Sequence, residues 1–419
     1  MKFSELDLKP EILKALIDMG YEELTPIQEK TFSPILSGRD LLARAETGSG
    51  KTAACGIPLV QMIDPSLNAI QALILVPTRE LALQYVEEID KISSLTDVAP
   101  FAIFGGFSME IQKAKLRNGV HILVATPGRL IDFLSHTNII DLSYVRTLVL
   151  DEADEMLKMG FIEDMEFIMS CLIHEHQTLF FAATMPEEID RLIKVYLKRP
   201  VRMELNKEQI APQSLVHHFQ YTGRRDRLKA LIEYLKREKI SQAIIFCNSR
   251  PHSEKLIKEL EGKFKSIGYI HGGLEQSRRT SIFERFRRNE ITFMVATDIA
   301  SRGLDFSHVS HVINYDYPFG LESYTHRTGR TGRMGRSGIA MTFVTDQELE
   351  NVNSLFKTNR IDPVWHGHIP NFRAASKQKR NGKKYFKKHL PSTSQKSSIK
   401  VGGMIPVPIS PHQQETTSL

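Results

Sequence analysis

Residues 40–52 read Asp40-Leu41-Leu42-Ala43-Arg44-Ala45-Glu46-Thr47-Gly48-Ser49-Gly50-Lys51-Thr52, an apolar run that leads into a glycine-rich loop and then a helical pattern. Small residues in such a loop let backbone N–H groups approach phosphate oxygens, and the N-terminus of the following helix adds a partial positive charge. Lys51 can neutralise the β- and γ-phosphates, and the Thr52 hydroxyl can coordinate Mg²⁺. A simple turn would explain Gly48 and Gly50 but not Lys-Thr at this spacing. The stretch therefore predicts a triphosphate-binding loop, formed by Ala45, Thr47, Gly48, Ser49, Gly50, Lys51 and Thr52, with Ala45 where such loops usually begin with glycine.

Outward from this loop, short apolar runs alternate with helical patterns along most of the chain. Each run has three to six residues, is rich in Val, Ile, Leu and Phe, and does not alternate strictly with polar residues. That pattern is typical of strands buried on both faces of a parallel sheet. One series comprises residues 40–45, 72–76, 101–104, 121–125, 147–150 and 178–182; a second begins near Val216 and continues with 243–247, 266–270, 293–296, 311–314 and 340–344. We expect two doubly wound α/β domains in tandem.

Changes in composition suggest the domain boundaries. Residues 198–213 are polar and contain two prolines, which favours a connector over a continuing element. Residues 377–400 are mostly Lys, Ser, Gln and Asn, too polar to offset the entropy of ordering. We therefore predict a first domain over 1–205, a linker over 206–214, a second domain over 215–365, and a flexible basic tail over 366–419.

The charge distribution points to a polyanion as partner. Between Arg373 and Lys400 there are ten Lys or Arg and no acid, and one acid follows, so the net charge of this tail is +9. Because the whole chain carries +6, the remaining residues carry −3. Lys and Arg that neutralise phosphates release condensed counterions, which makes nucleic acid the leading candidate. Cys55, Cys171 and Cys247 have no paired or metal-binding spacing, and no run of eighteen apolar residues occurs. We expect a reduced, cytoplasmic location and no membrane partner.

An acidic motif, Asp151-Glu152-Ala153-Asp154, ends the apolar run 147–150. A carboxylate at the carboxyl end of a parallel strand faces the crevice where such folds bind ligands. Asp151 could hold Mg²⁺ through water, and Glu152 could orient or deprotonate the attacking water. Alone, the run would be read as a solvated acidic surface; together with the phosphate loop it predicts a hydrolytic site.

Three arginines alternate with glycines in the second domain, in the stretch His326-Arg327-Thr328-Gly329-Arg330-Thr331-Gly332-Arg333. Planar guanidinium groups on a tight loop are suited to phosphates. A basic turn that binds the RNA backbone is one interpretation. The other is that Arg330 and Arg333 act as arginine fingers that stabilise charge on the γ-phosphate.

These motifs, in this order, resemble those of the DEAD-box RNA helicases, a family of two tandem RecA-like domains, from Phe3 to about Asp362. The resemblance implies an RNA-dependent ATPase that uses ATP and Mg²⁺. Gln28, in the stretch from Gly20 to Gln28, would hydrogen-bond the adenine edge, since an amide both donates and accepts. Phe3 would stack on the adenine ring, although by itself it would be read as a core residue. Asp305 would lie toward the ribose.

The resemblance also assigns RNA-contacting and coupling residues. The former combine hydroxyls, glycine N–H groups and arginines suited to gripping the backbone without reading bases; they are Pro77, Thr78, Arg79, Gly105, Gly106, Thr126, Pro127, Gly128, Arg129, Gln276, Arg279 and Thr297. The coupling residues are Asp154, Ala182, Thr184 and His326. We expect a monomer whose partner is single-stranded or short duplex RNA bound without sequence preference, with ribosomal or RNA-decay proteins as candidate protein partners.

One position departs from the family pattern. The coupling motif, usually Ser-Ala-Thr, is Ala182-Ala183-Thr184, which removes a hydroxyl near Asp154. We hypothesise that ATP hydrolysis is retained while its coupling to strand separation is weakened. An ATP-gated RNA clamp with weak unwinding is therefore the alternative function, and a DNA-translocating helicase is a third, disfavoured by Gln28 and the acidic motif. The tail would add RNA affinity, with Tyr385 and Phe386 stacking on bases, or serve as a solubilising arm.

Overall fold

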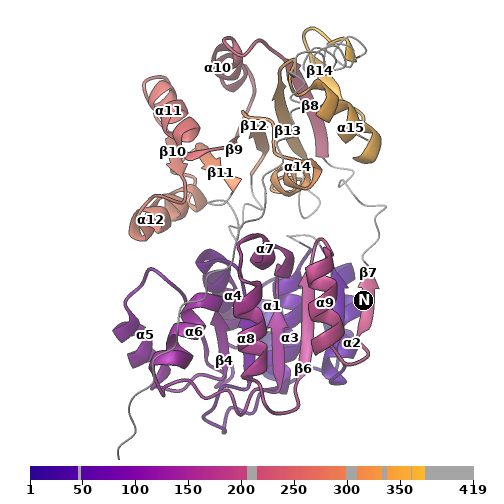
Figure 1. Cartoon of the computed structure of the whole chain (residues 1–419). Helices are drawn as coiled ribbons and strands as arrows, with labels where there is room; N and C mark the ends of the chain where they lie inside the picture. Colours follow the sequence, from indigo (N-terminus) through magenta and orange to yellow (C-terminus); the bar gives the residue numbers. More distant parts are fainter. Residues whose placement is uncertain (46–48, 205–214, 299–308, 333–336, 360, 373–419) are drawn as a thin grey trace, which may run out of the picture. The chain divides into compact units, whose positions relative to one another are not determined.

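A computed structural model describes residues 1–45, 49–204, 215–298, 309–332, 337–359 and 361–372 (Figure 1). We call residues 1–204 the first lobe and residues 215–372 the second lobe. Each lobe contains a seven-stranded sheet in which every pair of neighbouring strands is parallel. The prediction of two doubly wound α/β units is confirmed.

The first sheet has the order β3-β4-β2-β5-β6-β1-β7. Its strands are β1 (Leu41–Arg44), β2 (Ala72–Leu75), β3 (Pro100–Ile103), β4 (Ile122–Ala125), β5 (Thr147–Leu150), β6 (Gln177–Ala182) and β7 (Val201–Glu204). The connecting helices are α1 (Pro10–Asp18), α2 (Pro26–Leu36), α3 (Lys51–Met62), α4 (Arg79–Ile92), α5 (Met109–Leu116), α6 (Pro127–His136), α7 (Ala153–Lys158), α8 (Ile162–Ser170) and α9 (Glu187–Tyr196), with a short 3₁₀ turn, η1, at Phe3–Glu5.

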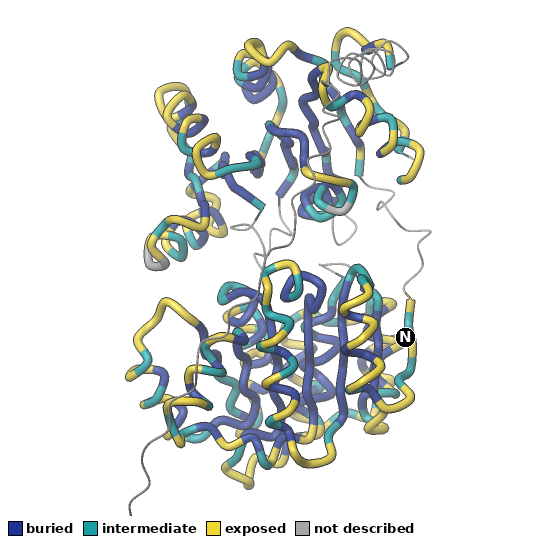
Figure 2. Tube along the Cα trace, viewed as in Figure 1, coloured by how far each residue is buried: buried dark blue, intermediate teal, exposed yellow. Residues whose placement is uncertain are grey.

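Helices cover both faces of this sheet, which explains why its strands are apolar throughout. Leu41 and Phe181 pack into a core cluster beneath α1 to α4, whereas the adjacent Leu42 and Phe180 pack into a second cluster beneath α5 to α9. Successive side chains on a strand point to opposite faces, so both sets must be apolar when both faces are covered. Figure 2 shows the central strands as continuously buried.

The second sheet has the order β10-β11-β9-β12-β13-β8-β14, the same topology as the first. Its strands are β8 (Leu215–Tyr221), β9 (Ala243–Cys247), β10 (Ile267–Ile270), β11 (Phe293–Thr297), β12 (His311–Asn314), β13 (Gly338–Val344) and β14 (Val364–His366). The described helices are α10 (Arg227–Arg237), α11 (Arg250–Glu261), α12 (Gln276–Arg287), α14 (Leu321–Thr328) and α15 (Leu349–Asn359). The second lobe therefore repeats the first, strand for strand.

Two of the four edge strands, β7 and β14, differ from the sequence-based expectation. β7 lies within residues 198–213, where we expected only a connector, because Val201 and Met203 pack on the core while Arg202 and Glu204 face outward. β14 crosses the predicted boundary at 365, and the Phe372 ring lies 5.9 Å from that of Trp365. The predicted linker and the tail beyond Phe372 lie outside the described residues.

Cys55 and Cys247 are buried, Cys171 is half-buried, and all three are free thiols. Within the described ranges, every helix is too short or too polar to cross a membrane.

Candidate active site

The strand order separates the candidate residues of the first lobe into two groups. Because all strands are parallel, the loops that follow them meet at one edge of the sheet. The loops after β3, β4 and β2, which are neighbours in the sheet, carry the predicted RNA-contacting residues: Gly105 and Gly106; Thr126, Pro127, Gly128 and Arg129; Pro77, Thr78 and Arg79. The loops after β5, β6 and β1 carry the predicted ATP and coupling residues: Asp151, Glu152 and Asp154; Ala182 and Thr184; Ala45 and Ser49 to Thr52.

The phosphate loop and the acidic motif meet in a buried ion pair. Lys51 Nζ lies 3.2 Å from Asp151 Oδ1, and the two residues are 6% and 2% exposed. The ammonium group also donates to the carbonyl of Ala45 at 3.2 Å. Burial by itself would lower the pKa of Lys51, but the charges of Asp151 and Glu152 outweigh it and raise that pKa. The lysine is therefore held charged at the place where phosphates were predicted to bind.

Asp151 is held by two further donors. The Tyr85 hydroxyl, on α4, donates to Asp151 Oδ2 at 2.7 Å, and the backbone N–H of Glu152 donates to Oδ1 at 2.8 Å. Burial and the charge of Asp151 raise the pKa of Tyr85 well above its ordinary value, so the phenol stays protonated and donates. Sequence reasoning missed Tyr85, because a tyrosine on the apolar face of a helix is indistinguishable by pattern from a core residue.

Glu152 is constrained in both backbone and charge. Its φ of 52° lies in the left-handed region, which is uncommon for a residue other than glycine and is found preferentially at functional sites. Burial raises the pKa of its carboxyl, the charge of Lys51 opposes the shift, and Asp151 adds to it. A carboxylate with a raised pKa is suited to accepting a proton from water.

The residues present fit a magnesium ion held mainly through water and phosphate. Thr52, half-buried in the first turn of α3, offers a hydroxyl oxygen, and Asp151 offers a carboxylate; both are hard oxygen ligands. Among the residues that the structure describes, no group of three or more His, Cys, Asp or Glu could hold a metal. Mg²⁺ commonly uses one or two protein oxygens together with substrate phosphates and water, so the donor set is compatible with it.

Of the two predicted adenine-reading residues, Gln28 contacts the phosphate loop directly. Gln28 accepts from the backbone N–H of Thr25 at 2.8 Å and donates to the carbonyl of Gly50 at 3.4 Å. Gly50 has φ +95°, and a Cβ there would lie 2.9 Å from Thr25 Oγ1. Phe3 is 2% exposed and packs on Tyr21 at 5.8 Å between ring centroids, which agrees with its interpretation as a core residue. The adenine contacts of Gln28 and Phe3 remain predictions.

Asp154 has three partners in the loop after β6 despite the missing serine. Its Oδ2 accepts from the backbone N–H and the hydroxyl of Thr184 at 3.0 and 2.8 Å, and Oδ1 accepts from the N–H of Ala183 at 3.3 Å. Ala182 is fully buried at the end of β6. Within the first lobe, the departure from the family pattern therefore leaves Asp154 hydrogen-bonded.

The predicted RNA-contacting residues of the first lobe are also held by contacts within that lobe. Arg79 donates to the carbonyl of Gly106 at 3.3 Å and lies over the Phe104 ring at 4.5 Å. Thr78 caps α4, because its side chain accepts from the N–H of Leu81. Thr126 stands directly before the first residue of α6, and Gly128 in the first turn of that helix is exposed. Loops after neighbouring strands thus present glycine backbone, hydroxyls and an arginine at one edge.

In the second lobe, Arg327 is the central residue of the arginine motif, and sequence reasoning missed it. Only 1% exposed, it donates to Asp298 Oδ1 and Oδ2 at 2.5 and 2.7 Å and to Asn248 at 2.7 Å. These bonds join the loops after β11 and β9 to α14. Arg327 and Arg330 are each followed by Thr-Gly-Arg, so the sequence gave no signal for a distinct role of Arg327.

The other second-lobe candidates are placed as follows. His326 lies in the last turn of α14, Arg330 is buried in the turn after it, and Thr297 ends β11. Gln276 begins α12, and Arg279 is half-buried on the same helix. Four predicted residues lie outside the described residues: Thr47, Gly48, Asp305 and Arg333.

Comparisons with known proteins agree with this geometry. The sequence model described as DEAD/DEAH box helicase matches residues 25–192, and that described as Helicase conserved C-terminal domain matches residues 226–335. The chain is 41% identical over 358 residues to the DEAD-box ATP-dependent RNA helicase CshA of Geobacillus kaustophilus, covering 85% of this chain and 76% of that protein. It is likewise 41% identical over 365 residues to the ATP-dependent RNA helicase CshA of Listeria monocytogenes, covering 87% and 70%.

Solved structures with a similar fold include nucleic-acid complexes. Dbp5 of S. cerevisiae, bound to RNA and ADP BeF3, matches with a TM-score of 0.78 and 26% identity, covering 91% of this chain and 99% of that chain. Mss116p, bound to ssRNA and AMP-PNP, matches with a TM-score of 0.79 and 30% identity, covering 90% and 81%.

Proposed function

Since this chain belongs to the DEAD-box family of ATP-dependent RNA helicases, we propose that ATP binds in the first lobe and that its hydrolysis drives local separation of short RNA duplexes or remodelling of RNA–protein complexes. The observation that carries the proposal is the buried Lys51–Asp151 pair beside Glu152, at the edge where the phosphate loop ends. A charged lysine in a buried site, next to carboxylates, is suited to binding phosphate groups that displace water from that site.

Each group in the first lobe has a distinct role in the proposal. Lys51 neutralises the β- and γ-phosphates, while the Thr52 hydroxyl would coordinate Mg²⁺ and Asp151 would hold the ion through water, so that the ion could offset charge on the phosphates when bound. Glu152 accepts the proton of the attacking water. Its backbone strain and raised pKa support this role.

The second lobe supplies the arginines in the proposal. Arg330 and Arg333 stabilise charge on the transferred phosphoryl group after RNA and ATP together bring the lobes to a closed state. Phosphate release then reopens the molecule, which would make domain motion part of each cycle. The buried network of Arg327 would keep the arginine loop in position.

The RNA would lie along the carboxyl edge of β3, β4 and β2 and the corresponding edge of the second lobe. Hydroxyls, glycine backbone and arginine support binding to sugar and phosphate without base recognition. The clamp alternative is not favoured, because the relatives are ATP-dependent RNA helicases by name. We further propose that the protein acts in the cytoplasm as a monomer, with ribosomal or RNA-decay proteins as candidate partners.

The direct test measures ATP hydrolysis and strand displacement with a short RNA duplex, with a DNA duplex of the same sequence as control. We expect the RNA duplex, and not the DNA duplex, to stimulate ATP hydrolysis and to be separated into single strands. Equal stimulation by DNA would support the DNA-helicase alternative instead.

The role of Glu152 has its own test. Glu152→Gln is expected to lower kcat for ATP by about 100-fold or more, because the base is lost, while nucleotide binding is retained and RNA stays bound. Filter binding would measure how long the RNA stays bound, and titration with a fluorescent ATP analogue would measure nucleotide binding. Rapid ATP turnover by this variant would exclude Glu152 as the base.

A further inference from the structure

Tyr85 forms a contact that the proposed mechanism does not yet use. Its side chain is fully buried on α4, and its hydroxyl donates to Asp151 Oδ2 at 2.7 Å across 66 positions of sequence. A hydrogen bond from a hydroxyl to a carboxylate is charge-assisted and stronger than one between neutral groups. The contact therefore restrains the carboxylate that we assign to Mg²⁺.

The three donors to Asp151 divide between its two oxygens. Oδ1 faces Lys51 Nζ at 3.2 Å and the N–H of Glu152 at 2.8 Å, whereas Tyr85 supplies the donor to Oδ2. Lys51 is itself expected to interact with phosphate during the reaction, and the Glu152 N–H belongs to the residue assigned to the attacking water. Tyr85 is the donor that belongs to neither the phosphate loop nor the acidic motif, so it can hold the carboxylate while Lys51 changes partners.

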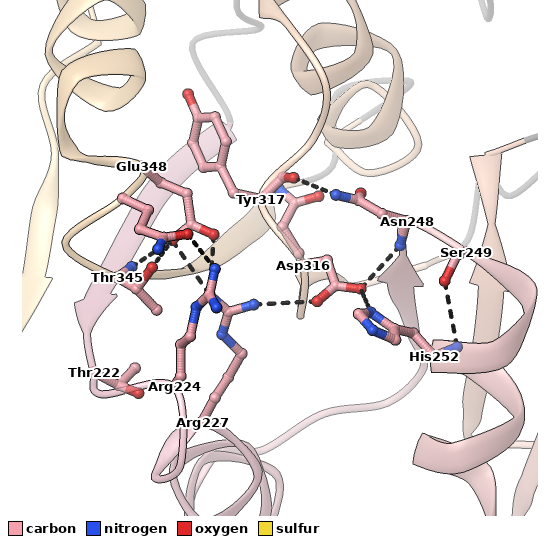
Figure 3. Close-up of polar contacts among 12 residues, drawn as sticks. Thr222, Arg224, Arg227, Asn248, Ser249, His252, Asp316, Tyr317, Thr345 and Glu348 are labelled. Atoms are coloured by element: carbon pink, nitrogen blue, oxygen red, sulfur yellow. Dashed lines mark hydrogen bonds and ion pairs between the residues drawn. The ribbon is translucent and has the colours of Figure 1, made fainter. Parts of the chain in front are cut away.

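The second lobe contains a counterpart of this arrangement. Asp316, after β12, occupies the topological position of Asp151 after β5. Arg227 of α10 lies 3.1 Å from its Oδ1, and His252 of α11 and the backbone N–H of Asn248 lie 3.1 and 3.0 Å from its Oδ2 (Figure 3). A strand-end carboxylate held by a cation from one helix and a ring donor from the next thus occurs twice in the chain.

The two sites differ in what surrounds the cation. Arg227 is also bound to Glu348, at 3.2 and 3.3 Å, so a second carboxylate of the chain occupies the side of the guanidinium away from Asp316 (Figure 3). Lys51 instead donates to a backbone carbonyl, that of Ala45. Arg227 is shared between two carboxylates of the chain, whereas Lys51 bonds to Asp151 and to the carbonyl of Ala45, which begins the predicted phosphate loop. The Tyr85 hydroxyl therefore lies beside the proposed reaction centre, whereas the His252 ring lies within a network of the chain's own charged groups.

We propose that Tyr85 is a positioning residue for ATP hydrolysis: its hydroxyl fixes the Asp151 carboxylate in the orientation that holds Mg²⁺ and leaves Glu152 directed at the attacking water. The inference rests on the proposed function of this site. Tyr85 touches no atom of ATP in this scheme, and it acts through Asp151. Because it is carried by α4, whose first turn holds Arg79, the restraint comes from the half of the edge assigned to RNA.

The test is Tyr85→Phe, which removes one oxygen and keeps the ring. We expect ADP affinity measured in EDTA to remain unchanged and the gain in affinity on adding Mg²⁺ to fall by about tenfold, the size of one hydrogen bond to a charged group. RNA-stimulated kcat should fall by a similar factor and should not recover at saturating Mg²⁺. Calorimetry with ADP, with and without Mg²⁺, measures binding independently of activity.

Two further variants separate positioning from packing. Tyr221→Phe removes a hydroxyl-to-carboxylate bond, to Asp346 in the second lobe, and should change neither Mg²⁺-dependent ADP affinity nor kcat. Tyr85→Leu removes ring and hydroxyl and should lower kcat as Tyr85→Phe does, with an added loss of thermal stability. If Tyr85→Phe keeps Mg²⁺-dependent affinity and kcat within twofold of wild type, or only Tyr85→Leu lowers kcat, the hydroxyl has no positioning role. Absence of RNA-stimulated hydrolysis in the wild-type protein would instead refute the proposed function itself.

Discussion

At the scale of single residues, Gly50 shows how tightly the nucleotide loop is fitted to its surroundings. Its φ of +95° favours glycine, and a Cβ would lie 2.9 Å from Thr25 Oγ1 and 3.0 Å from Gln28 Nε2. The motif predicted a glycine here, because backbone must approach phosphate. It did not predict that the side chains crowding this glycine would be those of Thr25 and Gln28, in the predicted adenine-reading segment.

Gly50→Ala should therefore lower ATP affinity by about tenfold or more, since both the loop conformation and Gln28 must shift. Gly38→Ala is the matched control: its φ is +72°, but no atom lies within 4 Å of the added Cβ. Both variants should lose about 1–2 kcal/mol of unfolding free energy from backbone strain, and only Gly50→Ala should lose ATP affinity. Fluorescent-nucleotide titration and urea denaturation measure the two effects. Equal ATP affinity in the two variants would contradict the crowding argument.

The hypothesis about Ala182 also belongs to this scale. Ala182→Ser should raise the number of strands separated per ATP hydrolysed, because it restores a hydroxyl beside Asp154. Thr184→Val is the opposing variant, since it removes the 2.8 Å bond from Thr184 Oγ1 to Asp154 Oδ2 and should lower that ratio. Simultaneous measurement of phosphate release and duplex separation gives the ratio. If Ala182→Ser and wild type give the same ratio, the missing serine does not weaken coupling.

Among the site residues, those in local motifs could be predicted, and those defined by long-range contacts could not. Lys51, Asp151 and Glu152 could be proposed as site residues because each belongs to a short motif with a fixed chemical purpose. Tyr85 and Arg327 were missed because their partners lie 66 and 29 positions away, in other elements. From the sequence pattern, a tyrosine on an apolar helix face is assigned to the core, and an arginine in a motif is assigned to ligand binding. Only the tertiary structure shows which side chains each of them contacts.

At the scale of elements, two strands of the second lobe carry buried neutral histidines. His217 in β8 and His311 in β12 are 7% and 4% exposed, and burial lowers the pKa of each to about 4. His217 is hydrogen-bonded to the Tyr324 hydroxyl at 2.8 Å, and His311 to Ser310 Oγ at 2.9 Å. The neutral rings hold β8 and β12 against α14 and the preceding loop.

Acid should therefore destabilise the second lobe. A histidine whose folded pKa is below its unfolded value of about 6.5 contributes stability above that value, and this is lost as the pH falls toward the folded pKa. Each group should cost about 2 kcal/mol between pH 7 and pH 5. Urea denaturation at several pH values measures the slope. His311→Gln should flatten it by the contribution of one group, whereas His174→Gln, at an exposed position, should leave it unchanged. A pH-independent wild type would contradict buried neutral rings.

Element boundaries were predicted well for most strands and poorly for the edge strands β7 and β14. Strands β5, β9 and β12 were predicted to the residue, because a strand covered on both faces is apolar throughout. β7 and β14 were missed because an edge strand has an exposed side and an alternating or polar sequence resembling a loop.

At the scale of the whole molecule, the basic tail is expected to bring sequence-independent RNA affinity. Residues 373–419 carry ten Lys or Arg and one acid. Removing all residues after Ala375 should flatten the dependence of log affinity on log salt, because fewer counterions are released. A shortened chain with an unchanged salt slope would identify the tail as a solubilising arm. RNA binding measured from about 50 to 200 mM salt distinguishes the two.

The sequence by itself determined the fold class, the internal repeat of two parallel-sheet domains and the chemistry of the nucleotide loop, because each depends on residues close together along the chain. The tertiary structure decided which of these segments become neighbours. Strand order, set by packing between elements distant in sequence, gathers the loops after β5, β6 and β1 into one group and those after β3, β4 and β2 into another. It also brings Tyr85 to Asp151 and Arg327 to Asp298. No local pattern encodes these contacts, because the backbone hydrogen bonds of helices and sheets form without specifying the partner of each side chain.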